Sequence, residues 1–298
     1  TATTTDAHCG IASGSITVNG TGGTGPYQYS LDGVTYQLSN VFSSLAANSY
    51  LVRVKDANNC NGTITVVLSD SPPMGGVYTV GSGGDFNTLT AAVQAYNTNC
   101  ISGPITFLLT DANYSTNETF PITINSNIYA SNVNTLTIKP AIGASPIITG
   151  NNGTAILRFN GADYVTIDGS NTVGGITRDL HIENSSTASG NTVIRFNSNG
   201  ATDGVTNNSI RSCVISGSSS AGTYGGIVSG GQTVGSEAET PNSDNIFFNN
   251  QISKVQSGIV LVGPAGGETG NQVSGNQIGS TIETEKLSRN GILLRNQQ

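Results

Sequence analysis

The sequence predicts an all-β protein whose larger part is a stack of repeated coils. Charged residues make up only 10% of the 298 residues, and glycine occurs 39 times. This composition is poor in helix formers and rich in residues that favour strands and turns. One short apolar phrase also returns at a nearly constant interval after residue 154. Its register marks are 37, 34, 32 and 33 residues apart, namely Ile156, Val193, Ile227, Ile259 and Ile292. Self-similarity at such a period is typical of a solenoid.

The overall charge and the chain ends limit the classes of protein. The formal net charge of −7 argues against nucleic-acid binding, because a phosphate backbone needs a basic face. No run of about 18 apolar residues occurs, so no membrane-spanning helix is predicted. Residues 1–5 lack the charged and apolar regions of a signal peptide, which indicates a mature piece or a fragment. The chain stops inside a repeat, at residues 295–298, so we expect further protein or another element to cover that end.

Residues 1–70 are predicted to form a small separate domain. Alternating apolar and polar residues mark strands at 15–18, 27–31, 49–56 and 62–68. Several short strands at this spacing predict an immunoglobulin-like β-sandwich. Cys9 and Cys60 bracket the set, and we predict a disulfide between them, with two free thiols as the alternative. The bridge would add about 2–5 kcal/mol of stability and would indicate an oxidising compartment.

Two stretches of this first domain carry a family resemblance. Residues 22–33 and 40–60 resemble the repeat unit of SprB-type gliding adhesins, and the resemblance covers nearly all of residues 6–68. Such units occur in long surface proteins of Bacteroidota that are usually exported by the type IX secretion route. The resemblance implies a secreted, cell-surface protein in which this unit is a spacer or an adhesive module. It implies no catalytic residue.

A linker is predicted at residues 71–76, which include Pro72 and Pro73. The only convincing helix follows at 88–96, where Asn87 or Thr88 can cap it. Its apolar face consists of Leu89, Ala92, Val93 and Tyr96. We predict that this helix plugs the first coil of a β-solenoid. The stretch resembles the N-terminal cap of pectin-lyase-like proteins, including pectin methylesterases. The resemblance implies that residues 77–298 form a right-handed parallel β-helix with a short N-terminal capping helix.

A second repeated phrase occupies 210–215, 247–252 and 273–278. In each copy apolar residues stand five apart, and one slot holds Cys213, Asn250 or Asn276. An odd spacing indicates a bend between two short strands, with the asparagine in the bend. Stacked asparagines can form a hydrogen-bonded ladder, and asparagine tolerates left-handed backbone. We therefore interpret Cys213 as a packed corner residue rather than a nucleophile.

The candidate acids for an active site are Asp163, Asp168, Asp179, Glu183, Asp203 and Asp244. A non-catalytic role accounts for two of these acids. Asp168 precedes a glycine and is expected in a turn, and Asp179 is expected on a solvent-exposed face. His181 is expected to point outward as a weak candidate base. Arg158 and Arg195 occupy the same place in successive coils and should stack, which is unfavourable for like charges about 4.8 Å apart.

Two explanations of the arginine pair are open. The arginines share Asp163 or Asp203, or they mark a stripe that binds an anionic ligand. The candidate ligand-binding residues are therefore Arg158, Arg195 and Asp179. The pectin methylesterase signature around its catalytic aspartates is absent, and so are the motifs of polygalacturonases. No catalytic residue is transferred from either family.

No zinc site is predicted, because the cysteines and histidines lack metal-ligand spacing. No cofactor is expected, although calcium at turns such as those of Asp32 or Asp56 is an open alternative.

The sequence as a whole favours a non-catalytic fragment of a large secreted cell-surface adhesin, active in gliding motility or surface attachment. The β-helix would act as a rigid scaffold or a glycan-binding surface, and the partners would be surface glycans or other cell-surface proteins. The alternative is a polysaccharide lyase or hydrolase whose catalytic coil lies near Asp168, Asp179 and Arg195.

Overall fold

The computed structural model describes residues 1–298 and divides into two compact units, Thr1–Pro73 and Met74–Gln298. The unit boundary follows Pro73, and the first strand of the second unit already begins at Met74, inside the range predicted as a linker. No helix is long and apolar enough to cross a membrane.

The first unit consists of two three-stranded antiparallel sheets. One has the order β1-β3-β5 and the other β4-β6-β7. Alternating residues of both sheets are buried and meet in a small apolar core that includes Ile16, Val52 and Val66. A short parallel pair joins β2 to β8. The strands are β1 (Ala2–Thr5), β2 (Ala7–His8), β3 (Gly14–Val18), β4 (Gln28–Ser30), β5 (Val41–Leu45), β6 (Asn48–Lys55), β7 (Asn61–Leu68) and β8 (Asp70–Ser71).

The predicted disulfide between Cys9 and Cys60 is absent. Cys60 is a free, exposed thiol in the turn between β6 and β7. The backbone N–H of Cys9 donates to the carbonyl of Ser71, beyond the other end of β7. The eight residues of β7 span about 26 Å at about 3.3 Å per residue, whereas bridged Cα atoms lie within about 7 Å. Cys9 and Cys60 therefore lie near opposite ends of β7, too far apart for a disulfide.

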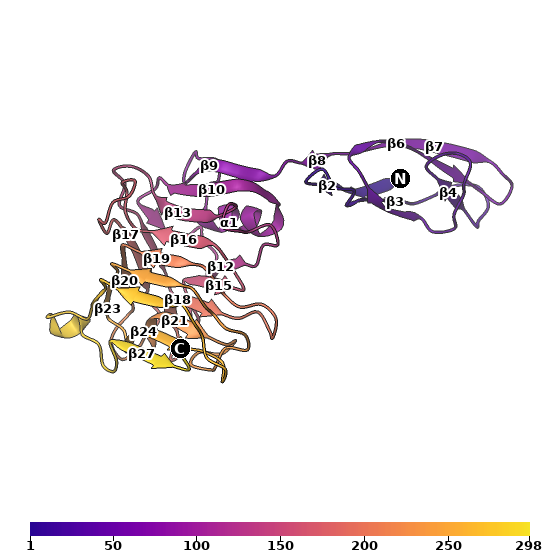
Figure 1. Ribbon diagram of the computed structural model, residues 1–298. Coiled ribbons are helices and arrows are strands. Elements are labelled where there is room, and N and C mark those ends of the chain that lie inside the picture. Colours follow the sequence, from indigo (N-terminus) through magenta and orange to yellow (C-terminus); the bar gives the residue numbers. More distant parts are fainter. The chain divides into compact units, whose positions relative to one another are not determined.

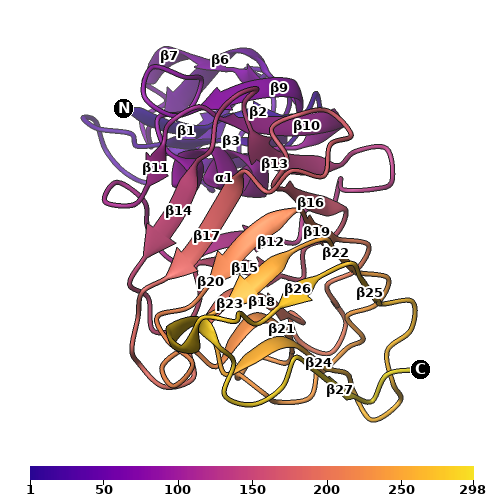
Figure 2. The same cartoon turned by 90° about the vertical axis from the view of Figure 1, so that its left-hand side faces the viewer.

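The second unit is a parallel β-helix, and each complete coil contributes one strand to each of three sheets (Figure 1). The first sheet holds β9 (Met74–Val80), β10 (Ile101–Leu109), β13 (Leu136–Pro140), β16 (Val165–Asp168), β19 (Ser209–Arg211), β22 (Ile246–Phe248) and β25 (Gln272–Ser274). The second holds β11 (Asn113–Tyr114), β14 (Ile147–Gly150), β17 (Leu180–Asn184), β20 (Cys213–Ser216), β23 (Gln251–Ser253) and β26 (Gln277–Ile278). The third holds β12 (Ile122–Asn125), β15 (Leu157–Asn160), β18 (Thr192–Asn197), β21 (Gly225–Gly230), β24 (Ser257–Val262) and β27 (Ile292–Arg295). Figure 2 shows β14, β17, β20 and β23 side by side. A 3₁₀ turn, η1 (Glu283–Glu285), lies in the loop before β27.

Identical residues stack inside the helix because successive coils are in register. The rings of Phe159 and Phe196 are parallel, with centroids 4.3 Å apart. The predicted period is confirmed, but the register marks of the first two coils are Leu157 and Ile194, which align with Ile227. Ile156 and Val193, one residue earlier, are equally buried, so hydrophobicity alone did not distinguish the two positions.

The capping helix α1 (Leu89–Thr98) is confirmed. The Thr88 hydroxyl accepts a hydrogen bond from the Ala91 N–H at 3.0 Å, and the predicted apolar face is buried. At the edge of the third sheet, Asn97 donates to the Thr123 carbonyl at 2.8 Å and accepts from the Asn125 N–H at 2.9 Å. These bonds imitate those of a neighbouring strand, so α1 satisfies the edge of β12 as well as covering the core.

The asparagine ladder at the corner between the first and second sheets is also confirmed. Asn276 Oδ1 accepts from the Asn250 N–H at 2.9 Å, and Asn250 Oδ1 accepts from the Cys213 N–H at 3.0 Å. The left-handed residue is the one before the slot, as in Ser212 and Asn249. The sequence prediction placed that conformation on the asparagine itself, which is wrong by one position.

Candidate functional site

The outward side chains of β12, β15 and β18 form one polar surface on the third sheet. We call this surface the polar face, and it comprises Thr123, Asn125, Arg158, Asn160, Arg195 and Asn197. Arg158 and Arg195 are register partners on adjacent strands, so their predicted stacking is confirmed. A chain of amide hydrogen bonds runs beside them, from Asn197 to Asn160 at 2.8 Å and from Asn160 to Asn125 at 3.0 Å.

Arg158 is half-buried and bonded to two amide oxygens. Its Nε donates to Asn197 Oδ1 at 2.7 Å, and its Nη2 donates to Gln232 Oε1 at 3.1 Å. Gln232 lies in the loop after β21, and it is exposed. The Nη2 group of Arg158 is therefore bonded to a side chain, that of Gln232, which is itself exposed to solvent.

Arg195 is only 4% exposed. Its Nη2 donates to the Gly231 carbonyl at 2.6 Å, whereas its buried Nη1 has no hydrogen-bond partner. Burial, followed by the charge of Arg158, lowers the pKa of Arg195 to about 10, so the group stays protonated at neutral pH. Neither arginine has a carboxylate oxygen within 4.0 Å.

The acids proposed to compensate these charges are engaged elsewhere. Asp163 accepts from the N–H and the hydroxyl of Thr206, both at 2.7 Å, and burial raises its pKa. Asp203 lies 3.3 Å from the Asn199 amide nitrogen. The explanation in which the arginines share Asp163 or Asp203 is therefore wrong. Glu239 acts on Arg195 from a longer distance, and its carboxylate accepts from the Ser198 hydroxyl at 2.5 Å.

The loop after β21 folds back over the third sheet. The Ala238 N–H donates to the Val262 carbonyl at 3.2 Å. Beneath and beside this loop, the outward positions after Arg195 are Val228, Val260 and Leu293, which belong to a small apolar cluster. The outward position thus changes from charged to apolar after two coils.

Asp168 takes part in an ion-pair ladder on the first sheet. Its carboxylate lies 2.8 Å from Arg211 Nη2 and 3.8 Å from Lys139 Nζ, and its side chain is 2% exposed. Arg211 is its register partner one coil further on, 43 residues away in sequence. Sequence reasoning missed both cations, although they lie in strands of the coils on either side, Lys139 in β13 and Arg211 in β19.

Asp179 and His181 lie at the start of the second sheet. Asp179 accepts from the Thr177 hydroxyl at 2.6 Å and from the Asn171 N–H at 3.0 Å. His181 Nε2 lies 2.7 Å from Ser216 Oγ, and burial lowers the histidine pKa. Ser216 is 3% exposed, so this serine is packed away from solvent. Asp168 and Asp179 lie at the corner between the first and second sheets, where the Asp179 N–H donates to the Gly169 carbonyl at 2.8 Å. Arg195 lies on the third sheet, so the structure does not bring it together with these two acids.

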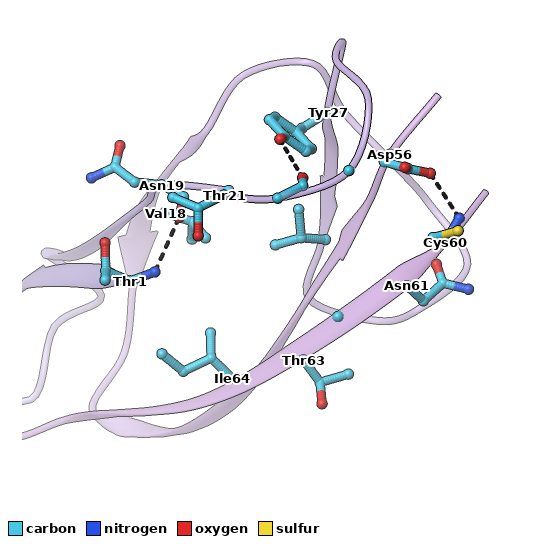
Figure 3. A pocket seen from close by; sticks show the side chains of 15 residues that line it. Thr1, Val18, Asn19, Thr21, Tyr27, Asp56, Cys60, Asn61, Thr63 and Ile64 are labelled. Carbon is cyan, nitrogen blue, oxygen red and sulfur yellow. Dashed lines mark hydrogen bonds between the residues drawn. The ribbon is translucent and has the colours of Figure 1, made fainter. Parts of the chain in front are cut away.

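The first unit carries a groove of about 430 Å³ between the turn after β3 and the start of β7 (Figure 3). Tyr27, Val54 and Ile64 form an apolar floor, and Gly62 faces Val54 across the two strands. In Figure 3, Ile64 points toward the opposite wall and Thr63 points away from it. The remaining lining residues are Thr1, Val18, Asn19, Gly20, Thr21, Gly22, Gly23, Asp56, Cys60, Asn61 and Thr63. An apolar floor with amides and hydroxyls at its rim suits an uncharged, hydroxyl-rich ligand.

The two aspartates considered for calcium hold turns together. Asp56 accepts from the N–H groups of Thr24, Asn58 and Cys60 at 3.1, 2.9 and 2.8 Å. Asp32 accepts from two backbone N–H groups and one hydroxyl, all at 2.8 Å. These hydrogen bonds lower the pKa of both carboxyls. The chain holds no group of three or more His, Cys, Asp or Glu side chains that would bind a metal.

Comparison with known proteins finds a family match at the N-terminal end of the chain. The SprB repeat family matches residues 1–36, which confirms the resemblance of the first unit. No curated protein matches the chain. Two crystal structures of the pectin methylesterase from Aspergillus niger are similar to it. The penultimately deglycosylated form is 14% identical with a TM-score of 0.33, covering 68% of each chain. The deglycosylated form is 13% identical with a TM-score of 0.33, covering 72% of this chain and 70% of its own. At these scores the likeness bears on no activity.

Proposed function

We propose that this protein is a non-catalytic part of a secreted, cell-surface adhesin. The SprB repeat match at residues 1–36 supports a surface protein of the adhesin type. The second unit would act as a rigid scaffold, because its three parallel sheets share one continuous apolar core. The proposal also includes export by the type IX route and a role in gliding motility or attachment.

One observation carries the non-catalytic assignment. Of the side chains that a lyase or hydrolase would need, Arg195 lies on the third sheet, whereas Asp168 and Asp179 lie at the corner between the first and second sheets. Asp168 is held in ion pairs, and Asp179 accepts two local hydrogen bonds. General acid–base chemistry needs groups that converge on one reacting bond. These groups instead stabilise the turns and coils in which they lie.

The groove of the first unit is the proposed attachment site, with surface glycans as its ligands. Its volume of about 430 Å³ accommodates part of a sugar chain, and its rim offers amides and hydroxyls. Tyr27 adds an aromatic ring, which sugar rings contact through their apolar faces. Other cell-surface proteins are the alternative partner class.

A glycan array with the full chain tests this proposal, followed by titration of any ligand found. We expect binding without turnover. Gly62→Phe should abolish binding, because a ring at this position fills the groove, where an added Cβ meets no atom within 4 Å. Thr65→Ala is the matched control, since this exposed residue of β7 does not line the groove, and it should bind like the wild type.

Incubation with acidic polysaccharides, pectin included, tests the alternative. The proposal predicts no bond cleavage. Turnover that disappears in Asp179→Ala or Arg195→Ala would establish the lyase or hydrolase instead. Immunolabelling of intact source cells checks the surface location, and an exclusively internal signal would overturn it.

A further inference from the structure

The polar face of the third sheet carries two positive charges, and the acid that acts on Arg195, Glu239, is not in ion-pair contact with either. Arg158 and Arg195 stack on adjacent strands, and neither has a carboxylate oxygen within 4.0 Å. Arg195 is 4% exposed, and its Nη1 is buried without a hydrogen-bond partner. A buried guanidinium that lacks a directly paired carboxylate is costly, and so is a neighbouring like charge. An anion bound beside the pair would relieve both costs.

We propose that the polar face binds the acidic groups of an anionic polysaccharide, with Arg158 as the direct contact and Arg195 reinforcing its charge. This inference rests on the proposed adhesin function and assigns it a second ligand class, separate from that of the groove. The shared chemistry is an anionic oxygen group on a sugar. A uronate supplies it as a carboxylate, and a sulfated sugar supplies it as a sulfate ester.

The surroundings of the arginines suit a sugar chain rather than a lone ion. Asn125, Asn160 and Asn197 form a row of amides beside them, one in each coil. Successive coils are about 4.8 Å apart, which is comparable with the length of one sugar ring in a chain. Amides donate to and accept from hydroxyl groups, so a chain crossing the strands meets the half-buried amides of Asn125 and Asn160. Asn197 is 1% exposed and instead holds the Nε of Arg158 in place.

A second cavity extends the polar face past its first coil. Thr123 is the register partner of Arg158, and it also lines a groove of about 190 Å³ between α1 and β12. The α1 residues of this groove include the polar side chains of Thr90, Gln94 and Asn97. The arginine pair is therefore continuous with a concave, polar-lined surface that can hold adjoining sugar units.

Gln232 determines how a ligand reaches the arginines. Its Oε1 accepts from Arg158 Nη2 at 3.1 Å, and its side chain is exposed. A ligand carboxylate or sulfate oxygen can replace this neutral acceptor, and charge-assisted hydrogen bonds are stronger than neutral ones. Gln232 thus competes with the ligand for the same N–H group.

Isothermal titration of the full chain tests the inference with three probes: an oligogalacturonate, a sulfated oligosaccharide and a neutral malto-oligosaccharide. We expect binding of at least one anionic probe, no binding of the neutral probe to this face, and weaker binding at high salt. Arg158→Gln should weaken anionic binding by about tenfold or more, since it removes a charged contact. Gln232→Ala should bind at least as tightly as the wild type, because it removes the internal competitor.

Arg295→Gln is the matched control. Arg295 lies in β27 of the same sheet, is exposed and lies 3.5 Å from Glu237, so its loss should leave anionic binding unchanged. Melting curves verify that each variant is folded, and Arg158 is chosen over the more buried Arg195 for this reason. Failure of both anionic probes, or equal affinity in Arg158→Gln and the wild type, overturns the inference. Neutral-glycan binding that is lost in Gly62→Phe would still support the adhesin function in that case.

Discussion

The side-chain oxygen of Asn250 accepts a hydrogen bond from the backbone N–H of Cys213 at 3.0 Å, across one coil boundary. The Asn250 amide nitrogen also donates to the Ile210 carbonyl at 2.8 Å. Both protein partners are buried, so water does not replace these bonds easily. One side chain therefore satisfies a donor and an acceptor at a corner where the strand ladders are interrupted.

Asn250→Ala should destabilise the β-helix strongly. The substitution leaves the Cys213 N–H and the Ile210 carbonyl unsatisfied, at about 1–3 kcal/mol for each buried group. The free energy of unfolding in urea measures the loss. Asn276→Ala removes the equivalent side chain from the next coil, where it is half-buried, and should cost clearly less. Equal losses in the two variants would contradict this account.

Gly169→Ala should also destabilise the fold, because Gly169 approaches the next coil closely. Its N–H donates to the Arg211 carbonyl at 2.8 Å, and an added Cβ would overlap the carbonyl of Ser212. Overpacking of this kind costs about 1–3 kcal/mol. Gly153→Ala is a suitable comparison, since its new Cβ would meet only Ala188, at 3.8 Å. A melting temperature unchanged in Gly169→Ala would refute the close approach.

His181 should make stability fall as the pH falls below about 6.5. Burial lowers its pKa in the folded state, with Glu183 opposing and Lys254 adding to the shift. The unfolded chain then binds the proton more readily than the folded chain. The stability is therefore complete above the unfolded pKa and declines from there toward the folded pKa, by at most about 1.4 kcal/mol per pH unit.

Urea unfolding at about pH 8 and about pH 5 measures this dependence. His181→Gln keeps a polar side chain beside Ser216 but does not titrate. The loss of stability on acidification should be smaller in this variant than in the wild type. Identical pH profiles would show that His181 makes no contribution.

Cys60 and Cys213 should differ in thiol reactivity. Cys60 is exposed, whereas Cys213 is fully buried and burial raises the pKa of its thiol. A maleimide should label Cys60 in the native protein and reach Cys213 only after unfolding, because the thiolate is the reactive form. Peptide mapping by mass spectrometry distinguishes the sites. Native labelling of Cys213 would contradict its packed position.

Much of the fold could be predicted because stacking repeats its signals along the sequence. The period, the Asn250 and Asn276 slot and the pairing of Arg158 with Arg195 all recur at one-coil intervals. The Thr88 cap and the face of α1 were predictable for another reason, since helix caps and helical periodicity are local.

Some features were missed because they depend on contacts between residues that are not equivalent copies of one repeated position. Asp168 and Arg211 are 43 residues apart and differ in residue type, so no recurring residue marks the pair. A second asparagine ladder escaped notice at the other end of the first sheet, where Asn208, Asn245 and Asn271 bond in the same way. Its sequence interval of 37 residues between Asn208 and Asn245 was a usable signal.

The absent bridge between Cys9 and Cys60 has a topological cause. Strand alternation predicts which residues face the core, but not which end of a strand lies near which loop. That information comes from the pairing of β6 with β7, which places Cys60 in the hairpin turn. The fold-back of Ala238 onto Val262 likewise depends on a loop conformation that no periodicity records.

Helix α1 restricts where the β-helix can gain new coils. Because Asn97 already occupies the bonding groups of β12, a new coil cannot be added beside α1 without displacing it. Duplication of an internal coil disturbs neither α1 nor the coils beyond the insertion, since each coil contacts only its neighbours. Each duplication would lengthen the rod by about 4.8 Å. The distance between two attachment points on such a protein is therefore a quantity that evolution can adjust in small, uniform steps.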